Sequence, residues 1–216
     1  YRSIMQASGV TWRDFRQPDD LRKIPVVTKS LLRSNYPQGT TRCTGLKTYE
    51  SSTSGSTGSN FYVREDSDTA GWYRASFLLA LEWAGWRLGQ PHVQMGMNLT
   101  RSLERKLKDL LLRCHYVSAF ELTDGHLDQV LLMMEKRSIQ HLWGYPGSVY
   151  WLARRAEQNG LNRPLKSVVT WGDNLYAHYR CSITRAFQTQ VFDTYGCAEG
   201  IQIAAELKKR RPGEIQ

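Results

Sequence analysis

The sequence lacks several features that would narrow its class at once. Its 216 residues contain no run close to the roughly 20 apolar residues that span a bilayer, and no signal-peptide pattern opens the chain. None of the four cysteines stands in a CxxC pair, which excludes a zinc ribbon or a dithiol redox motif. No helix-turn-helix, zinc-finger or aromatic-basic RNA motif is present. We therefore expect a cytoplasmic protein with reduced thiols and no membrane span.

Acidic residues are also scarce relative to basic ones. The chain has 20 Asp and Glu against 29 Lys and Arg, a net charge of +9. Such a balance favours an anionic partner, either a nucleic acid or an anionic substrate. However, four positive charges lie together at Lys208–Arg211, and most others are scattered along predicted helices. Nucleic-acid binding would rest on net charge alone, so we expect no nucleic-acid partner.

What is present is the composition of a globular chain. Apolar residues make up 41%, with seven Trp and eleven Tyr, which is enough for a sizeable core. The chain begins at Tyr1 in mid-pattern without an initiator Met, so we expect a fragment. Within it we expect a lead-in over 1–45, a core domain over 46–207 and a basic tail over 208–216.

Strands and helices alternate along the chain, with short connections. Strands are expected near 46–50, 60–64, 92–97, 115–119, 139–143, 167–170 and 190–194. Helices are expected over 29–35, 66–83, 102–113, 123–136, 146–159 and 176–187. This order predicts an α/β fold with a mostly parallel sheet covered by helices on both faces. Ligands of such sheets bind beyond the carboxyl ends of the strands.

The helix expected over 66–83 has apolar and aromatic side chains over a wide face. They are Trp72, Ala75, Phe77, Leu78 and Leu81. A face this wide is typical of a buried helix.

Six small residues between the first two predicted strands form the sequence Thr53-Ser54-Gly55-Ser56-Thr57-Gly58. Glycines let the main chain approach a ligand closely, and hydroxyls with free amides can donate to phosphate oxygens. A flexible linker has similar composition. The position between two strands favours the phosphate-binding interpretation.

Two later segments follow predicted strands. Trp171-Gly172-Asp173-Asn174 could let a flat ligand lie on the main chain, or Asp173 or Asn174 could cap the next helix. In Asp193-Thr194-Tyr195-Gly196, the tyrosine could stack on a nucleobase and Asp193 could accept from an exocyclic amine. Glu199, four residues after the tyrosine, could hold Mg²⁺. A buried tyrosine and a surface glutamate are the alternative.

Taken in order, these segments resemble the adenylate-forming superfamily, which includes acyl-CoA synthetases. The resemblance is strongest to the phenylacetate–CoA ligase family and its capsule-biosynthesis relatives, and it covers roughly residues 21–206. Three further segments fit: 24–29 with 35–37, 83–89, and 144–150. The family resemblance implies a large N-terminal AMP-binding domain, present here as a fragment without the C-terminal lid domain.

The resemblance also implies an activity. ATP and a carboxylic acid give an acyl-adenylate and pyrophosphate, and a thiol, usually coenzyme A in this family, then takes the acyl group. By this similarity Thr53–Gly58 holds phosphates and Glu199 coordinates Mg²⁺. The residues implied for adenine are Gly172, Asp173, Asn174, Asp193, Thr194, Tyr195 and Gly196. Those implied at the acyl pocket are Tyr145, Pro146 and Gly147. The partners are then ATP and a small carboxylic acid, and a homodimer stays an open alternative.

The sequence departs from the family pattern at several points. The loop continues Gly58-Ser59-Asn60 and lacks the usual lysine, and Ala198 replaces a Ser or Thr that bonds the adenylate phosphate. Losing one such hydrogen bond to a charged group costs about 1.5–3 kcal/mol. The ribose-binding Asp and the catalytic Lys of the lid domain are absent from the sequence, so the catalytic residue is unassigned. A non-catalytic nucleotide-binding or interaction module derived from this fold is therefore the alternative to a ligase.

Overall fold

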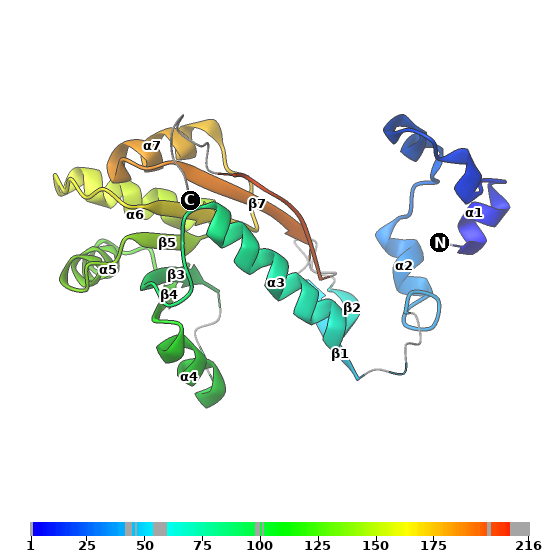
Figure 1. Ribbon diagram of the computed structural model, residues 1–216, viewed down its shortest axis with the longest axis horizontal. Coiled ribbons are helices and arrows are strands. Elements are labelled where there is room, and N and C mark those ends of the chain that lie inside the picture. Colours follow the sequence, from blue (N-terminus) through cyan, green and yellow to red (C-terminus); the bar gives the residue numbers. More distant parts are fainter. Residues whose placement is uncertain are drawn as a thin grey trace. The chain divides into compact units, whose positions relative to one another are not determined.

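The computed structural model describes residues 2–41, 45, 47–53, 60–97, 100, 102–197 and 200–207 (Figure 1). The chain divides into two compact units, Tyr1–Ser67 and Asp68–Gln216. Each is described separately below. No helix in the described ranges is long and apolar enough to cross a membrane.

The first unit joins short helices to a β-hairpin. Its elements are α1 (Arg2–Ala7), η1 (Trp12–Asp14), η2 (Pro18–Lys23), α2 (Lys29–Ser34), β1 (Thr48–Thr53) and β2 (Phe61–Asp66). The Thr28 hydroxyl caps α2 by accepting from the backbone N–H of Leu31 at 3.2 Å. Strands β1 and β2 pair antiparallel, with Thr53 opposite Phe61. The two strands predicted on either side of the Ser/Gly loop are therefore confirmed, and residues 54–59 between them lie outside the described residues.

The second unit is built on a six-stranded sheet in the order β4-β3-β5-β6-β7-β8. Its strands are β3 (His92–Gly96), β4 (Cys114–Ser118), β5 (His141–Gly144), β6 (Ser167–Thr170), β7 (Val191–Cys197) and β8 (Ile201–Ala205). Its helices are α3 (Ser67–Trp83), α4 (Leu103–Leu111), α5 (Asp124–Lys136), α6 (Pro146–Gln158) and α7 (Ala177–Phe187). Strands β3 to β7 pair in parallel, which confirms the predicted sheet, and only β8 pairs antiparallel, with β7.

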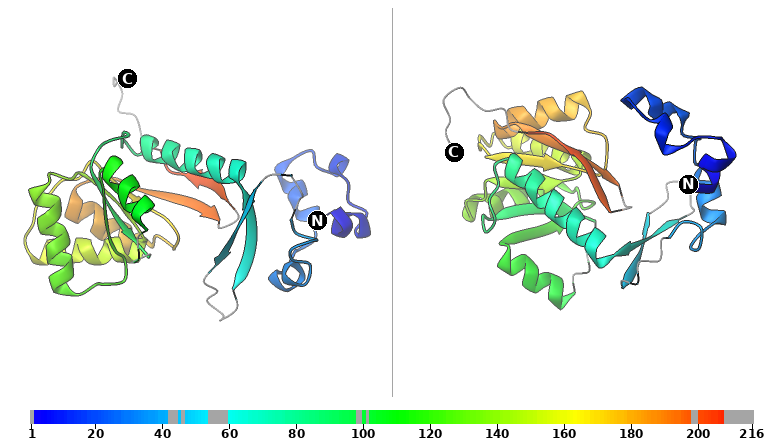
Figure 2. Two further views of the ribbon diagram at one scale, coloured as in Figure 1. Left: turned by 90° about the horizontal axis from the view of Figure 1, so that it is seen from below. Right: turned by 45° about the vertical axis from the view of Figure 1, so that its right-hand side comes forward.

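Helices cover both faces of this sheet (Figure 2). On one face, α5, α6 and α7 bury a large apolar cluster with alternate strand residues such as Leu142 and Val168. On the other, Leu81 of α3 packs with Trp86, Trp143 and Val169. Neighbouring residues of one strand therefore enter different clusters, because successive side chains point to opposite faces.

The prediction of a buried α3 is wrong. Only Ala80 and Leu81 of this helix are buried, whereas Trp72 is 76% exposed. Phe77 is half-buried and packs against the Trp86–Trp143 cluster. The C-terminal part of α3 covers the sheet, and its remaining apolar side chains face outward.

Candidate functional site

Two of the predicted segments meet at the carboxyl end of β6, where its parallel pairing with β7 also ends. Thr170, the last residue of β6, is in register with Asp193 of β7. Gly172 therefore leaves the sheet beside Thr194 and Tyr195. Strand ends at this edge are where parallel sheets bind ligands.

A hydrogen-bond network fixes these two strand ends. The buried Thr170 hydroxyl donates to Oδ1 of Asp193 at 2.6 Å, and the Thr194 hydroxyl donates to the Thr170 carbonyl at 2.9 Å. The second carboxylate oxygen of Asp193, Oδ2, accepts no hydrogen bond from the residues that the structure describes. Asp193 thus offers one oriented acceptor at the end of the sheet.

Gly172 occupies a position that only glycine fits. Its φ of +83° is left-handed, and a Cβ there would lie 2.6 Å from Cε1 of Tyr145. The Tyr145 ring therefore lies against the Gly172 backbone, and its hydroxyl donates to Sδ of Met97 at 2.7 Å. Burial raises the pKa of Tyr145, with smaller contributions from Tyr116 and Asp173, so the phenol stays protonated.

A pocket of about 440 Å³ lies beside these strand ends. Its lining residues come from α3, β3, the end of β6, and β7 with β8: Tyr73, Phe77, Gln94, Trp171, Gly172, Thr194, Gly196, Cys197 and Gln202. The Phe77 and Trp171 rings meet edge to face with centroids 5.4 Å apart. The pocket thus has an aromatic wall and a polar wall.

Several of these lining residues were not predicted as site residues. Gln202 lies on β8, a strand that the sequence did not indicate. Tyr73 lies on α3, and Phe77 was assigned to the core face of that helix. Gln94 lies on β3. The one feature of the sequence that could have pointed to Gln94 is that β3 ends at the ligand-binding edge of the sheet.

Tyr195 lies on β7 with its side chain 66% exposed. Its backbone carbonyl accepts from Nε2 of Gln202 at 3.1 Å, next to a register shift between Tyr195 and Gly196. The alternative of a buried tyrosine is therefore wrong. The ring is available to a flat ligand.

An ion pair between Arg180 and Glu206 also holds strand β7 in place. Arg180 of α7 donates to Oε1 of Glu206 at 2.8 Å and to the Val191 carbonyl at 2.7 Å. Oε2 of Glu206 in turn accepts from the backbone N–H of Asp193 at 3.0 Å. This bracket holds the backbone at Asp193 in place.

The other predicted residues lie around this edge or outside the described ranges. Asp173 and Asn174 are exposed, and neither caps α7, whose N-cap is Tyr176 without a side-chain hydrogen bond, so that alternative is wrong. Pro146 is buried at the start of α6, and neither it nor Gly147 lines the 440 Å³ pocket.

The phosphate and metal predictions fall largely on residues that the structure does not describe. Ser54, Gly55, Ser56, Thr57, Gly58 and Glu199 are such residues, as is Ala198; Thr53 ends β1. Among the described residues, no group of three or more His, Cys, Asp or Glu side chains is placed to hold a metal ion. Among the described residues, Cys114, Cys181 and Cys197 form no disulfide.

The mainly parallel sheet with its helical layers shares its fold with part of solved acyl-CoA ligase structures. No protein-family model matches the sequence, and no curated protein matches it. Two solved structures of 2-hydroxyisobutyryl-CoA ligase are similar. Its thioesterification-state complex with 2-HIB-AMP and CoA has a TM-score of 0.69 and 18% identity, covering 96% of this chain and 47% of that one. Its open conformation has a TM-score of 0.67 and 16% identity, covering 96% and 51%.

A more distant similarity is to O-succinylbenzoate coenzyme A synthetase from Bacillus subtilis, in complex with AMP. Its TM-score is 0.51 at 18% identity, covering 73% of this chain and 31% of that one. At these identities the likeness shows the fold. The chain spans about half the length of the 2-hydroxyisobutyryl-CoA ligase structures.

Proposed function

We propose that this chain forms the nucleotide- and acid-binding part of an ATP-dependent acid–thiol ligase. The observation that supports this most directly is the meeting of Gly172, Asp193 and Tyr195 at one sheet edge beside a ligand-sized pocket. The fold shared with acyl-CoA ligases supports the same class of reaction. The phenylacetate–CoA ligase branch is the finer proposal, and it rests on the sequence segments given above.

In this proposal the adenine lies across the β6 and β7 ends. The backbone after Gly172 supplies a flat surface, the free oxygen of Asp193 accepts from the exocyclic amine, and the exposed Tyr195 ring stacks on the base. Two of these groups are held before the ligand arrives: Gly172 by the Tyr145 ring and Asp193 by Thr170. Preorganised groups lose little conformational entropy on binding.

The acid's organic group is proposed to occupy the 440 Å³ pocket. That volume lies within the range of small-molecule sites, about 300–1,000 Å³. Its aromatic wall of Tyr73, Phe77 and Trp171 suits an aryl group, since aromatic rings pack edge to face or offset. Tyr145, predicted at the acyl pocket, then acts indirectly by supporting Gly172 from outside the cavity.

The reaction requires two balanced steps. The substrate carboxylate oxygen attacks the α-phosphorus of ATP and pyrophosphate leaves; the thiol sulfur of coenzyme A then attacks the carbonyl carbon and AMP leaves. The Thr53–Gly58 loop is proposed to donate hydrogen bonds to phosphate oxygens. Mg²⁺, when bound by Glu199 and the phosphates, would neutralise phosphate charge.

Nucleotide binding tests this proposal at Tyr195. Base–aromatic stacking contributes about 1–3 kcal/mol, so Tyr195→Ala should weaken ATP binding in isothermal titration calorimetry by about tenfold or more. Tyr195→Phe is the matched control, because it keeps the ring and loses only the hydroxyl. Equal ATP affinity in the wild type and Tyr195→Ala would contradict the stacking role.

A non-catalytic nucleotide-binding module is the second candidate, and Ala198 favours it. Pyrophosphate release, measured with a panel of aryl and fatty acids, separates the two. Turnover with any acid supports the ligase. ATP binding without pyrophosphate release for every acid of the panel supports the module.

A further inference from the structure

A second hollow lies at the opposite edge of the sheet from the candidate site. It has a volume of about 670 Å³ and is bordered by α4, by β4 and by the residue that follows α5. Arg113 and Pro91 precede β4 and β3, so the hollow opens at the amino ends of these parallel strands. It is therefore separate from the pocket beside Gly172.

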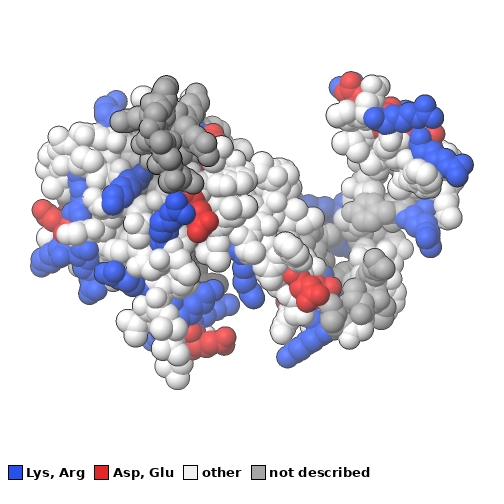
Figure 3. Space-filling model, in the orientation of Figure 1, with Lys and Arg blue, Asp and Glu red and all other residues white. Residues whose placement is uncertain are grey.

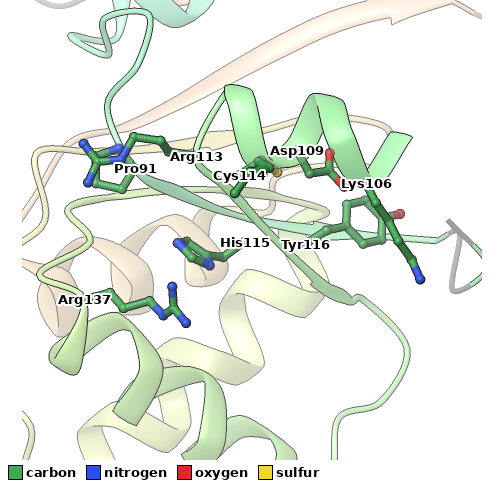
Figure 4. Close-up of a pocket in the computed structure, with 9 residues that line it drawn as sticks. Pro91, Lys106, Asp109, Arg113, Cys114, His115, Tyr116 and Arg137 are labelled. Carbon is green, nitrogen blue, oxygen red and sulfur yellow. The ribbon is translucent and has the colours of Figure 1, made fainter. Parts of the chain in front are cut away.

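Positive charge dominates its lining. Lys106, Arg113, His115 and Arg137 border the hollow, against one carboxylate, that of Asp109. In Figure 4 the His115 ring lies between the guanidinium groups of Arg113 and Arg137. Burial lowers the pKa of His115, and the charges of Arg137 and Arg113 lower it further. The positive charges of both guanidinium groups therefore act on this one imidazole ring.

These cations have no acidic partners in the described part of the chain. The side chains of Lys106, Arg113 and Arg137 make no ion pair and no hydrogen bond there, whereas Arg155 and Arg180 are both paired with carboxylates. Figure 3 shows basic side chains gathered on the α4 and α5 side of the second unit. Among the described residues, three cationic side chains of the lining therefore face one carboxylate, that of Asp109.

The backbone at Arg113 adds an independent observation. Its φ is +53°, in the left-handed region, where a Cβ is disfavoured and glycine is the usual residue after a helix. The Arg113 N–H still donates to Leu110 and its carbonyl accepts from His92 at 3.2 Å, so this conformation is fixed at both ends. The turn thereby fixes the position of Arg113 at the border of the hollow.

We propose that this hollow binds a phosphate-bearing small molecule through Arg113, Arg137 and His115. The planar fork of each guanidinium matches two phosphate oxygens, and charge-assisted hydrogen bonds of this kind are about twice as strong as neutral ones. The imidazole between them donates a further hydrogen bond. A volume of 670 Å³ admits a ligand of nucleotide size.

The test uses inorganic pyrophosphate as the probe and the histidine ring signals of the chain in nuclear magnetic resonance spectra as the readout. Pyrophosphate should shift the His115 signals saturably at constant ionic strength. The exposed ring of His178 on α7 is the internal control and should not shift. Because the readout is local to His115, pyrophosphate held by the Thr53–Gly58 loop does not mimic it.

Matched variants decide the result. Arg113→Gln with Arg137→Gln should weaken the His115-detected affinity by about tenfold or more. Arg105→Gln with Lys108→Gln removes the same charge from exposed positions of α4 that do not line the hollow, and should leave the affinity within about twofold. Arg137→Lys, which keeps the charge, should weaken binding less than Arg137→Gln.

Three outcomes would overturn the proposal: no saturable shift of His115, an equal shift of His178, or equal weakening in the two double variants. The last would mean that general charge attraction, with no built site, holds the anion. Far-ultraviolet circular dichroism confirms that each variant is folded before its affinity is compared.

Discussion

A glycine and a tyrosine ring at the end of β6 set the local geometry of the candidate site. Gly172→Ala introduces a Cβ 2.6 Å from the Tyr145 ring at a left-handed φ. We expect a loss of about 1–3 kcal/mol in the free energy of unfolding, measured by urea denaturation. Gly71→Ala is the matched control, because Gly71 lies inside α3 with nothing within 4 Å of an added Cβ, and it should gain about 0.5–1 kcal/mol.

The Thr170–Asp193 hydrogen bond is a second prediction at this scale. Thr170→Val keeps the shape of a fully buried side chain and removes the donor at 2.6 Å from the carboxylate. Hydrogen bonds to charged groups contribute about 1.5–3 kcal/mol, so urea denaturation should show a loss of up to this size. Thr170→Ser retains the hydroxyl and should keep the bond. A loss of stability with Thr170→Ser but none with Thr170→Val would instead assign the role of this side chain to the packing of its methyl group.

At the scale of elements, α5 and α6 are joined by one arginine. Arg155 donates two hydrogen bonds to Asp128, at 2.8 and 2.7 Å, and a third to Asp124 at 2.9 Å. The bonds from Arg155, with one from Asn159, lower the pKa of Asp128 from 3.8 to about 2. The folded protein therefore binds a proton at the Asp128 carboxylate more weakly than the unfolded chain does.

This difference predicts a pH dependence. The contribution of Asp128 to stability is complete above about pH 4 and is lost as the pH falls toward 2, because the unfolded chain takes up the proton first. Urea denaturation across pH 7 to 2 should show the wild type losing its advantage over Asp128→Asn in this window. Parallel curves for the two proteins would contradict it.

The elements themselves were largely predictable because local signals fix their ends. The hydroxyls of Thr28, Ser102 and Thr123 each cap a helix at the predicted place. Strand β8 was not predicted, since Ile201–Ala205 is a short and mostly exposed edge whose pairing depends on β7. The exposure of α3 was not predicted for a related reason. The apolar residues of a helix indicate which face is apolar, but tertiary packing decides whether other elements cover that face.

The candidate site, like the elements, was predictable only in part. Gly172 and Asp193 could be located from the sequence, because Gly172 follows β6 and Asp193 lies where the parallel pairing of β7 with β6 ends. The pocket beside them could not, because Tyr73 and Gln94 lie far along the chain from Gly172, and Gln202 lies on β8, which was not predicted. Their approach depends on the crossing of α3 over the sheet and on β8.

For the whole molecule, two buried histidines make the free energy of unfolding depend on pH in mildly acidic solution. Burial lowers the pKa of His92 and of His141 from 6.5 to about 4. The unfolded chain therefore takes up protons first below pH 6.5, and stability should fall between pH 6.5 and 4 by up to about 1.4 kcal/mol per pH unit for each histidine. His92→Phe, which keeps an aromatic ring against Trp143, should flatten this fall in urea denaturation. An unchanged slope would contradict the assignment to His92.

The aromatic cluster beneath α3 also determines what fluorescence can report. Of the seven tryptophans, Trp86 and Trp143 are at most 5% exposed, whereas Trp12 and Trp72 are already more than 75% exposed. A solvent-exposed indole already emits at long wavelength, so unfolding changes its emission little. The red shift on denaturation therefore comes mainly from the layer between α3 and the sheet. Tryptophan emission will therefore report the unfolding of that layer. The first unit can unfold with little change in the emission spectrum.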